Sequence, residues 1–126
     1  MKKFLLIIAL ISLSCWAQKP TIYGIGDSTM ANKVKPEENP EKGWGMLFPM
    51  FLTDQITFDN RAVNGRSTRS FIDEKKWEAV YKVLKKGDYV FIQFGHNDAK
   101  ELDSLRYANP HTAYQCRPWR RAVRCA

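Results

Sequence analysis

Three short segments carry the residue types that attack a carbonyl group and stabilise the charge that results: residues 26–30 (GDSTM), 60–67 (NRAVNGRS) and 95–98 (GHND). In the first segment, Ser28 offers a hydroxyl that can act as a nucleophile. In the second, Gly65 has no side chain, so its backbone N–H can closely approach a substrate oxygen. In the third, the side-chain amide of Asn97 can donate to developing negative charge without changing its protonation state.

Each of these residues also has an ordinary structural explanation. A serine after a strand is a common helix N-cap. A glycine there is often a turn residue that needs a positive φ, and an asparagine often caps the next helix or closes a turn. Residue type alone therefore leaves both explanations open for Ser28, Gly65 and Asn97.

Each of the three chemical segments follows or ends an apolar stretch of the chain, and these stretches must position them. The stretches predict three β-strands, at residues 21–26, 56–63 and 89–94. Between the last two strands, four apolar residues at helical spacing predict a helix that faces the core. They are Trp77, Val80, Tyr81 and Leu84.

The connecting segments contain boundary signals. Residues 43–52 are rich in apolar side chains, but Pro49 argues against one long regular helix there. Ser67 or Thr68 is expected to cap the helix after the second strand, and Gly87 stands where a helix C-terminus favours glycine.

Alternation of strands and helices predicts a parallel α/β sheet. The apolar run at residues 90–94 predicts burial on both faces of that sheet, as for an interior parallel strand. Because α/β sheets place ligands at the carboxyl ends of their strands, we expect the three chemical segments to meet at one edge.

The order and spacing of the three segments resemble the first three sequence blocks of the GDSL (SGNH) esterases. The longer strings IGDSTM, NRAVNGRSTRSF and FGHNDAK look most like the rhamnogalacturonan acetylesterase branch, and the resemblance covers residues 21–114. It implies a flavodoxin-like three-layer α/β/α parallel sheet, the SGNH hydrolase fold. It also implies a serine esterase that removes acetyl groups from a polysaccharide such as pectin, with no metal or organic cofactor.

The resemblance assigns roles residue by residue. Ser28 would be the nucleophile. The backbone N–H groups of Ser28 and Gly65 and the side chain of Asn97 would form the oxyanion hole. Asp27 would brace the turn that presents Ser28, and His96 would shape the pocket rather than abstract a proton.

The sequence departs from the family at the catalytic base. Family members supply the base and its orienting acid from an Asp-x-x-His block, but Gln93 lies three residues before His96 and Ala108 three before His111. We therefore expect a C-terminally truncated SGNH domain that is inactive alone, in which residues 90–94 are left as an uncovered apolar edge of the sheet. The alternative is a non-catalytic fragment that binds an acylated glycan.

Both ends of the chain differ from its body. Residues 1–17 resemble a signal peptide and predict export to the periplasm or the exterior after cleavage near Ala17, with lipoprotein anchoring at Cys15 or a buried N-terminal helix as alternatives. Residues 18–114 would form the esterase part. Residues 115–126 are a basic tail that contains Cys116 and Cys125, and we interpret the tail as the product of a frameshift.

The formal net charge of +7 comes largely from these ends. Residues 18–114 are nearly neutral, which argues against nucleic-acid binding. A dinucleotide loop starting at Gly24 is disfavoured because Thr29 replaces the third glycine of the motif. Three arginines are candidates for binding acidic sugars, with solvated surface charge as the alternative: Arg61, Arg66 and Arg69.

Overall fold

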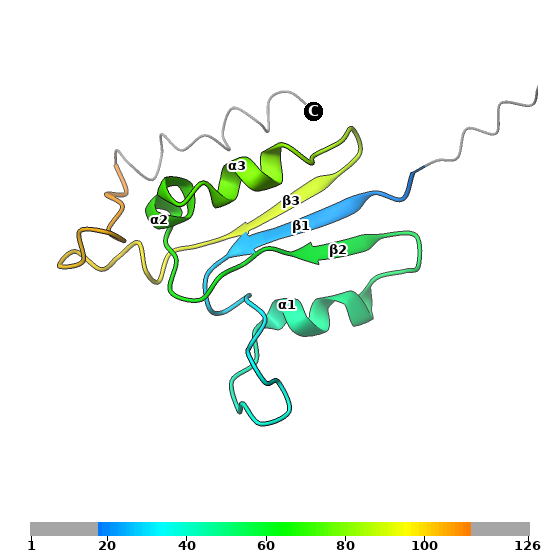
Figure 1. Cartoon of the computed structure of the whole chain (residues 1–126), viewed down its shortest axis with the longest axis horizontal. Helices are drawn as coiled ribbons and strands as arrows, with labels where there is room; N and C mark the ends of the chain where they lie inside the picture. The colour runs from blue at the N-terminus through cyan, green and yellow to red at the C-terminus, as the bar shows by residue number, and fades with distance from the viewer. Residues whose placement is uncertain (1–17, 112–126) are drawn as a thin grey trace, which may run out of the picture.

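A computed structural model describes residues 18–111 of the chain (Figure 1). The predicted signal peptide, the basic tail and all three cysteines lie outside these residues. The elements, in chain order, are β1 (Thr21–Gly26), α1 (Trp44–Leu47), the 3₁₀-helix η1 (Phe48–Phe51), β2 (Thr57–Asn60), α2 (Thr68–Asp73), α3 (Lys76–Tyr81) and β3 (Tyr89–Gln93).

The three strands form a parallel sheet in the order β2-β1-β3, as the sequence predicts. Thr21 pairs with Thr57 on one side of β1, and Ile22 pairs with Tyr89 on the other. All three carboxyl ends therefore point to the same edge of the sheet, where the arrowheads lie in Figure 1.

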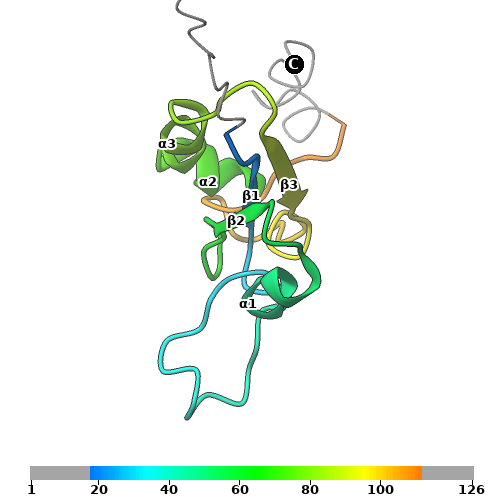
Figure 2. The same ribbon diagram turned by 90° about the vertical axis from the view of Figure 1, so that its right-hand side faces the viewer.

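Helices cover both faces of the sheet, which gives the expected three layers (Figures 1 and 2). Tyr23 and Ile25 of β1 face α2 and α3 and pack in a buried core with Phe71, Trp77 and Val80. On the opposite face, α1 and η1 contribute to an aromatic cluster with the strands. Its members are Trp44, Phe48, Phe58 and Phe91.

The helical region differs from the sequence prediction in its continuity. Ser67 is the N-cap of α2, and its side chain accepts from the backbone N–H of Ser70. The chain then breaks at Lys75, which adopts a left-handed conformation with φ of 56°, before α3 begins. Because α3 ends at Tyr81, that side chain is 57% exposed instead of facing the core. Gly87, with φ of 95°, lies in the turn before β3 rather than directly after the helix.

The predicted burial of residues 90–94 on both faces is wrong for the described part of the chain. Phe91 and Ile92 are 38% and 37% exposed. The physical reason is that β3 lies at the edge of the described sheet, with β1 on one side only, which agrees with the expectation of an uncovered apolar edge at residues 90–94. The second predicted strand is also shorter than expected, although Arg61 and Val63 still donate backbone hydrogen bonds to Gly24 and Gly26 of β1.

The start of α1 lies directly against the loop that follows β1. The backbone N–H groups of Trp44 and Gly45 donate to the carbonyl oxygens of Thr29 and Met30 at 2.9 and 3.2 Å. A Cβ atom on Gly45 would lie 2.6 Å from the Met30 oxygen and 2.5 Å from the side-chain nitrogen of Asn60. Only glycine fits at position 45, because the Met30 backbone and the Asn60 side chain lie too close for a Cβ atom. The first residues of α1 thereby support the loop that carries Ser28.

Replacing Gly45 with alanine is expected to lower the free energy of unfolding by about 3 kcal/mol, because a methyl group must displace backbone. Gly87→Ala is the control. Its Cβ would meet nothing within 4 Å, so only the positive φ opposes the change, at a cost of about 1 kcal/mol. Urea unfolding of both variants measures the difference, and equal losses would contradict close approach as the reason for Gly45.

Candidate active site at the carboxyl edge of the sheet

Ser28 lies in a tight turn at the end of the central strand. Asp27 is fully buried, and its side-chain Oδ1 accepts from both the backbone N–H and the hydroxyl of Thr29, at 3.0 and 2.9 Å. Its backbone oxygen accepts from Met30 and Ala31, which closes a single helical turn. These bonds hold the half-buried Ser28 at the tip of the turn.

The structure does not favour a capping role for Ser28. No helix begins there in the described part of the chain, and its hydroxyl makes no hydrogen bond within residues 18–111. Its backbone N–H is also without an acceptor in these residues. Both the hydroxyl and the N–H are thus available to a ligand.

Gly65 follows the second strand in a conformation that favours glycine, with φ of 72°. A Cβ at this position would meet nothing within 4 Å, so the backbone borders open space. Among the described residues nothing accepts its N–H. The turn explanation and the functional one are compatible here, because the left-handed turn is what leaves this N–H free.

Asn97 is 2% exposed, and its side-chain nitrogen donates to the backbone oxygen of Arg66 at 3.0 Å. An amide nitrogen carries two hydrogens, so one remains for a second acceptor. The bond crosses between loops and does not cap a local helix. It ties the segment after β3 to the residue that follows Gly65.

The neighbouring Asp98 makes a second link between the same loops. It is 5% exposed, and its Oδ1 accepts from the backbone N–H of Thr68 at 3.0 Å and from the Thr68 hydroxyl. The start of α2 is thereby fixed to the segment after β3. Its Oδ2, like that of Asp27, has no hydrogen-bond partner among residues 18–111.

One residue at this edge was not found from the sequence. Lys33 is buried, and its ammonium donates to the backbone oxygen of Ser28 at 2.6 Å and to Oδ1 of Asn64 at 3.3 Å. A lysine in a polar loop looks like surface charge in the sequence. Its burial depends on Asn64, which is 31 positions away, so no local pattern could have indicated it.

The histidines and Trp44 stay outside this arrangement. His96 and His111 are exposed, and neither side chain makes a hydrogen bond in the part of the chain that is described. Trp44 packs edge-on against Phe48, with ring centroids 5.5 Å apart, and also lies near Phe58. Trp44 thus belongs to the aromatic cluster against the sheet, although the residue remains 38% exposed.

The three candidate arginines are already paired with acids. Their nearest carboxylate oxygens lie at 2.8 Å for Arg61–Asp59, 3.1 Å for Arg66–Glu74 and 3.6 Å for Arg69–Asp73. Hydrogen bonding to Asp59 raises the pKa of Arg61 further. These pairs favour the surface-charge interpretation over an acidic-sugar site.

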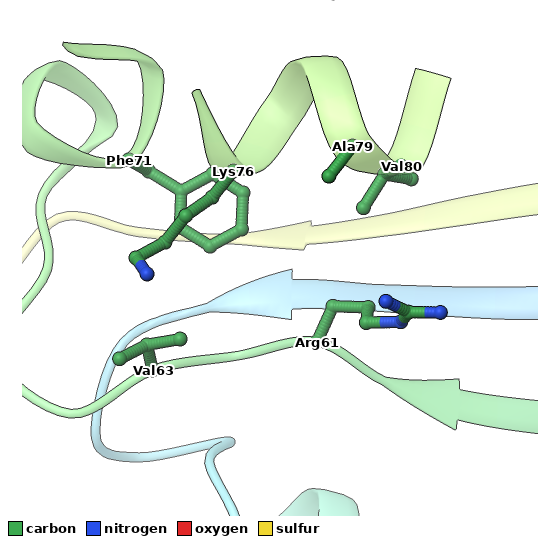
Figure 3. Close-up of a pocket in the computed structure, with 6 residues that line it drawn as sticks. All are labelled: Arg61, Val63, Phe71, Lys76, Ala79 and Val80. Carbon is green, nitrogen blue, oxygen red and sulfur yellow. The ribbon is translucent and has the colours of Figure 1, made fainter. Parts of the chain in front are cut away.

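A hollow of about 200 Å³ opens on the α2–α3 face of the sheet (Figure 3). It is lined by Arg61, Val63, Phe71, Lys76, Ala79 and Val80. Of the candidate catalytic or binding residues named from the sequence only Arg61 lines it, and Ser28, Gly65 and Asn97 do not, so the candidate site is the loop edge and not this hollow. Residues 18–111 also contain no group of three or more His, Cys, Asp or Glu side chains suited to a metal ion. Among them there is no helix with the length and apolar character needed to cross a membrane.

Replacing Asp98 tests the link to α2. Asp98→Ala leaves the N–H and hydroxyl of Thr68 without their acceptor, which should lower the free energy of unfolding by about 1–3 kcal/mol. Asp98→Asn keeps an oxygen acceptor and should lose less. Thermal unfolding of the two variants makes the comparison, and equal losses would show that charge rather than the acceptor matters.

Glu74 should make stability depend on pH. Partial burial raises the pKa of its carboxyl, but hydrogen bonds from Arg66 and Lys76 outweigh that effect and hold the pKa below its ordinary value of 4.5. A carboxyl with a lowered pKa in the folded state stabilises the fold above its unfolded pKa, and this contribution is lost as the pH falls through the folded pKa. Because Glu74 is substantially exposed, the contribution is about 0.5 kcal/mol.

Glu74→Gln should therefore remove part of the decline in stability below pH 4.5 and lower stability slightly at neutral pH. Glu37→Gln is the control, since Glu37 is exposed and makes no ion pair within the described residues. Urea unfolding across this pH range measures both. If the free energy of unfolding of Glu74→Gln falls below pH 4.5 as steeply as that of the unmodified chain, the role given to Glu74 is contradicted.

Known proteins resemble this chain over most of its length. A protein named "Probable rhamnogalacturonan acetylesterase YesY", from Bacillus subtilis (strain 168), is 36% identical over 94 residues, which are 75% of this chain and 42% of that protein. A rhamnogalacturonan acetylesterase of Emericella nidulans is 42% identical over 101 residues, or 77% of this chain and 37% of that protein. The chain thus spans less than half the length of these curated relatives.

A solved structure and a family model also match this chain. The crystal structure of protein YxiM from Bacillus subtilis matches with a TM-score of 0.60 at 34% identity, over 65% of this chain and 23% of that one. The model of the GDSL-like lipase/acylhydrolase family matches residues 22–116, which contain all three chemical segments. The chain is a member of the GDSL-like lipase/acylhydrolase family, as its sequence blocks predict.

Proposed function

We propose that this chain carries the nucleophile and oxyanion-binding part of a serine esterase that removes acetyl groups from a pectic polysaccharide. The observation that carries the proposal is the convergence of three features at one sheet edge. They are a serine at the tip of a braced turn and two loops that present backbone or amide N–H groups, Gly65 and Asn97. The names of the relatives support rhamnogalacturonan as the substrate.

In the proposed reaction, Ser28 Oγ attacks the carbonyl carbon of a sugar acetate. The carbonyl π electrons move to oxygen, and that oxyanion is stabilised by the N–H groups of Ser28 and Gly65 and by Asn97. As the tetrahedral intermediate collapses, the C–O bond to the sugar breaks, the sugar oxygen receives the proton that Ser28 Oγ gave to the base, and acetyl-Ser28 remains. Water then gives a proton to the same base and attacks the acetyl group, and Ser28 Oγ regains a proton as acetate leaves.

A base must accept the serine proton for this reaction to be fast. Neither His96 nor His111 lies in an Asp-x-x-His sequence, and both are exposed. We therefore infer that the chain alone acylates Ser28 slowly and that the base of the whole active site comes from outside residues 18–111. Export of the protein, which would bring it to polysaccharide outside the cell, is part of the same proposal.

The first test is acetyl transfer by the purified full chain. With p-nitrophenyl acetate, mass spectrometry should find an acetyl group on the peptide that contains Ser28. Ser28→Ala should remove it, whereas Ser104→Ala, at an exposed serine outside the three segments, should not. An adduct of equal yield in Ser28→Ala would refute Ser28 as the nucleophile.

The second test supplies a base. Residues 1–109 are joined to the part of the YesY relative that follows the matched region, and acetate release from acetylated rhamnogalacturonan is measured. Activity should rise about 10²–10⁴-fold over the chain alone, because that is the usual contribution of a positioned base. It should vanish on Ser28→Ala. A folded chimera that binds the polysaccharide without releasing acetate would instead favour a glycan-binding fragment.

A further inference from the structure

Lys33 connects two of the three loops at the proposed site. Its side chain is 5% exposed. The ammonium donates to the Ser28 backbone oxygen at 2.6 Å and to Oδ1 of Asn64 at 3.3 Å. Asn64 directly precedes Gly65, so a single cation contacts the nucleophilic residue and the neighbour of a proposed oxyanion donor.

A contribution to the stability of the fold does not explain why the Lys33 ammonium is buried. A buried ammonium is costly unless it is well paired. Its two hydrogen-bond acceptors are neutral, and the carboxylate within ion-pair distance in the described chain, Glu41, is 3.6 Å away and 76% exposed. A methionine would fill similar space without desolvating a charge.

The geometry also separates Lys33 from a role as base. A base must present a neutral nitrogen lone pair to the serine hydroxyl. Here the nitrogen is a donor in two hydrogen bonds, both directed at oxygen atoms other than Ser28 Oγ. Among the described residues, Lys33 therefore makes no hydrogen bond to the Ser28 hydroxyl through which it could accept that proton.

We propose that Lys33 is a positioning residue that sets the spacing between the N–H of Ser28 and the N–H of Gly65. This inference rests on the proposed function. The bridge joins the loop that follows β1 to the loop that follows β2. Asn60, the last residue of β2, also donates to the Met30 backbone oxygen and to Asn32 Oδ1 in the first loop. Within residues 18–111, Lys33 is the side chain that contacts both Ser28 itself and the residue next to Gly65.

The test uses Lys33→Met and Lys33→Arg in the full chain, with Lys35→Met as the control. Lys35 lies on the same loop but is exposed and pairs only with Glu38 in the described chain. Amide ¹H–¹⁵N signals and hydrogen-exchange rates of Ser28 and Gly65 report the bridge. The rate of Ser28 acetylation by p-nitrophenyl acetate reports its consequence.

In Lys33→Met, the Ser28 and Gly65 signals should both move, their amides should exchange faster, and acetylation should slow at least about 10-fold. The unfolding midpoint should stay unchanged or rise. Lys33→Arg keeps donors to both oxygens and should restore the signals and most of the rate. Lys35→Met should match the unmodified chain throughout.

Unmoved signals in a folded Lys33→Met would overturn the proposal, as would a loss of rate that Lys33→Arg and Lys33→Met share equally. If Lys33→Met does not fold, Asn64→Ala removes the other end of the bridge and should move the Gly65 signal and slow acetylation. Failure of the unmodified chain to acetylate at Ser28 would contradict the proposed function. The amide signals would still decide whether Lys33 spaces the two N–H groups.

Discussion

Parallel pairing of β1 with a strand on each side is the constraint on which the rest of the structure depends. It brings the ends of β2 and β3 beside the end of β1. Hydrogen bonds continue the pairing past the strands, from Asp27 to Gln93 and from Val63 to Gly26. The three loops consequently leave the sheet within one small region, even though Ser28, Gly65 and Asn97 are each more than 30 positions apart in the sequence.

The strand ends bring the loops together, but side chains fix how the loops lie. Asn97 holds the backbone of Arg66, Asp98 holds Thr68, and Lys33 joins Ser28 to Asn64. Buried polar atoms without partners, by contrast, cost stability and are uncommon in native proteins. The unpaired Oδ2 atoms of Asp27 and Asp98, within the described chain, lie in this same region. Local rules are most often broken at functional sites, where preorganisation compensates for the loss.

The sequence predicted what depends on local pattern and failed where distant contacts decide. The strands and their parallel arrangement follow from apolar runs and their alternation with helical spacing, and Ser28, Gly65 and Asn97 follow from block order. The break at Lys75 could not be predicted, because lysine has no preference for the left-handed conformation that it adopts there. Apolar composition alone wrongly predicted that Phe91 is buried, whereas the comparison with the family's longer sheet predicted the uncovered edge that β3 forms among the described residues. Lys33 is buried by groups from another loop.

Under the proposed function, the two energetic tasks of a serine esterase are spatially separable. Stabilising the oxyanion needs donors fixed before the reaction, and a sheet edge with cross-linked loops supplies them without any titrating group; each donor is worth about 10²–10³ in rate. Accepting the serine proton needs a base of suitable pKa, worth about 10²–10⁴. In the proposed site, the first requirement would be met by backbone and amide groups, which do not titrate near neutral pH. The free N–H groups of Ser28 and Gly65 therefore reflect how this sheet edge is built and do not require the base to be in place.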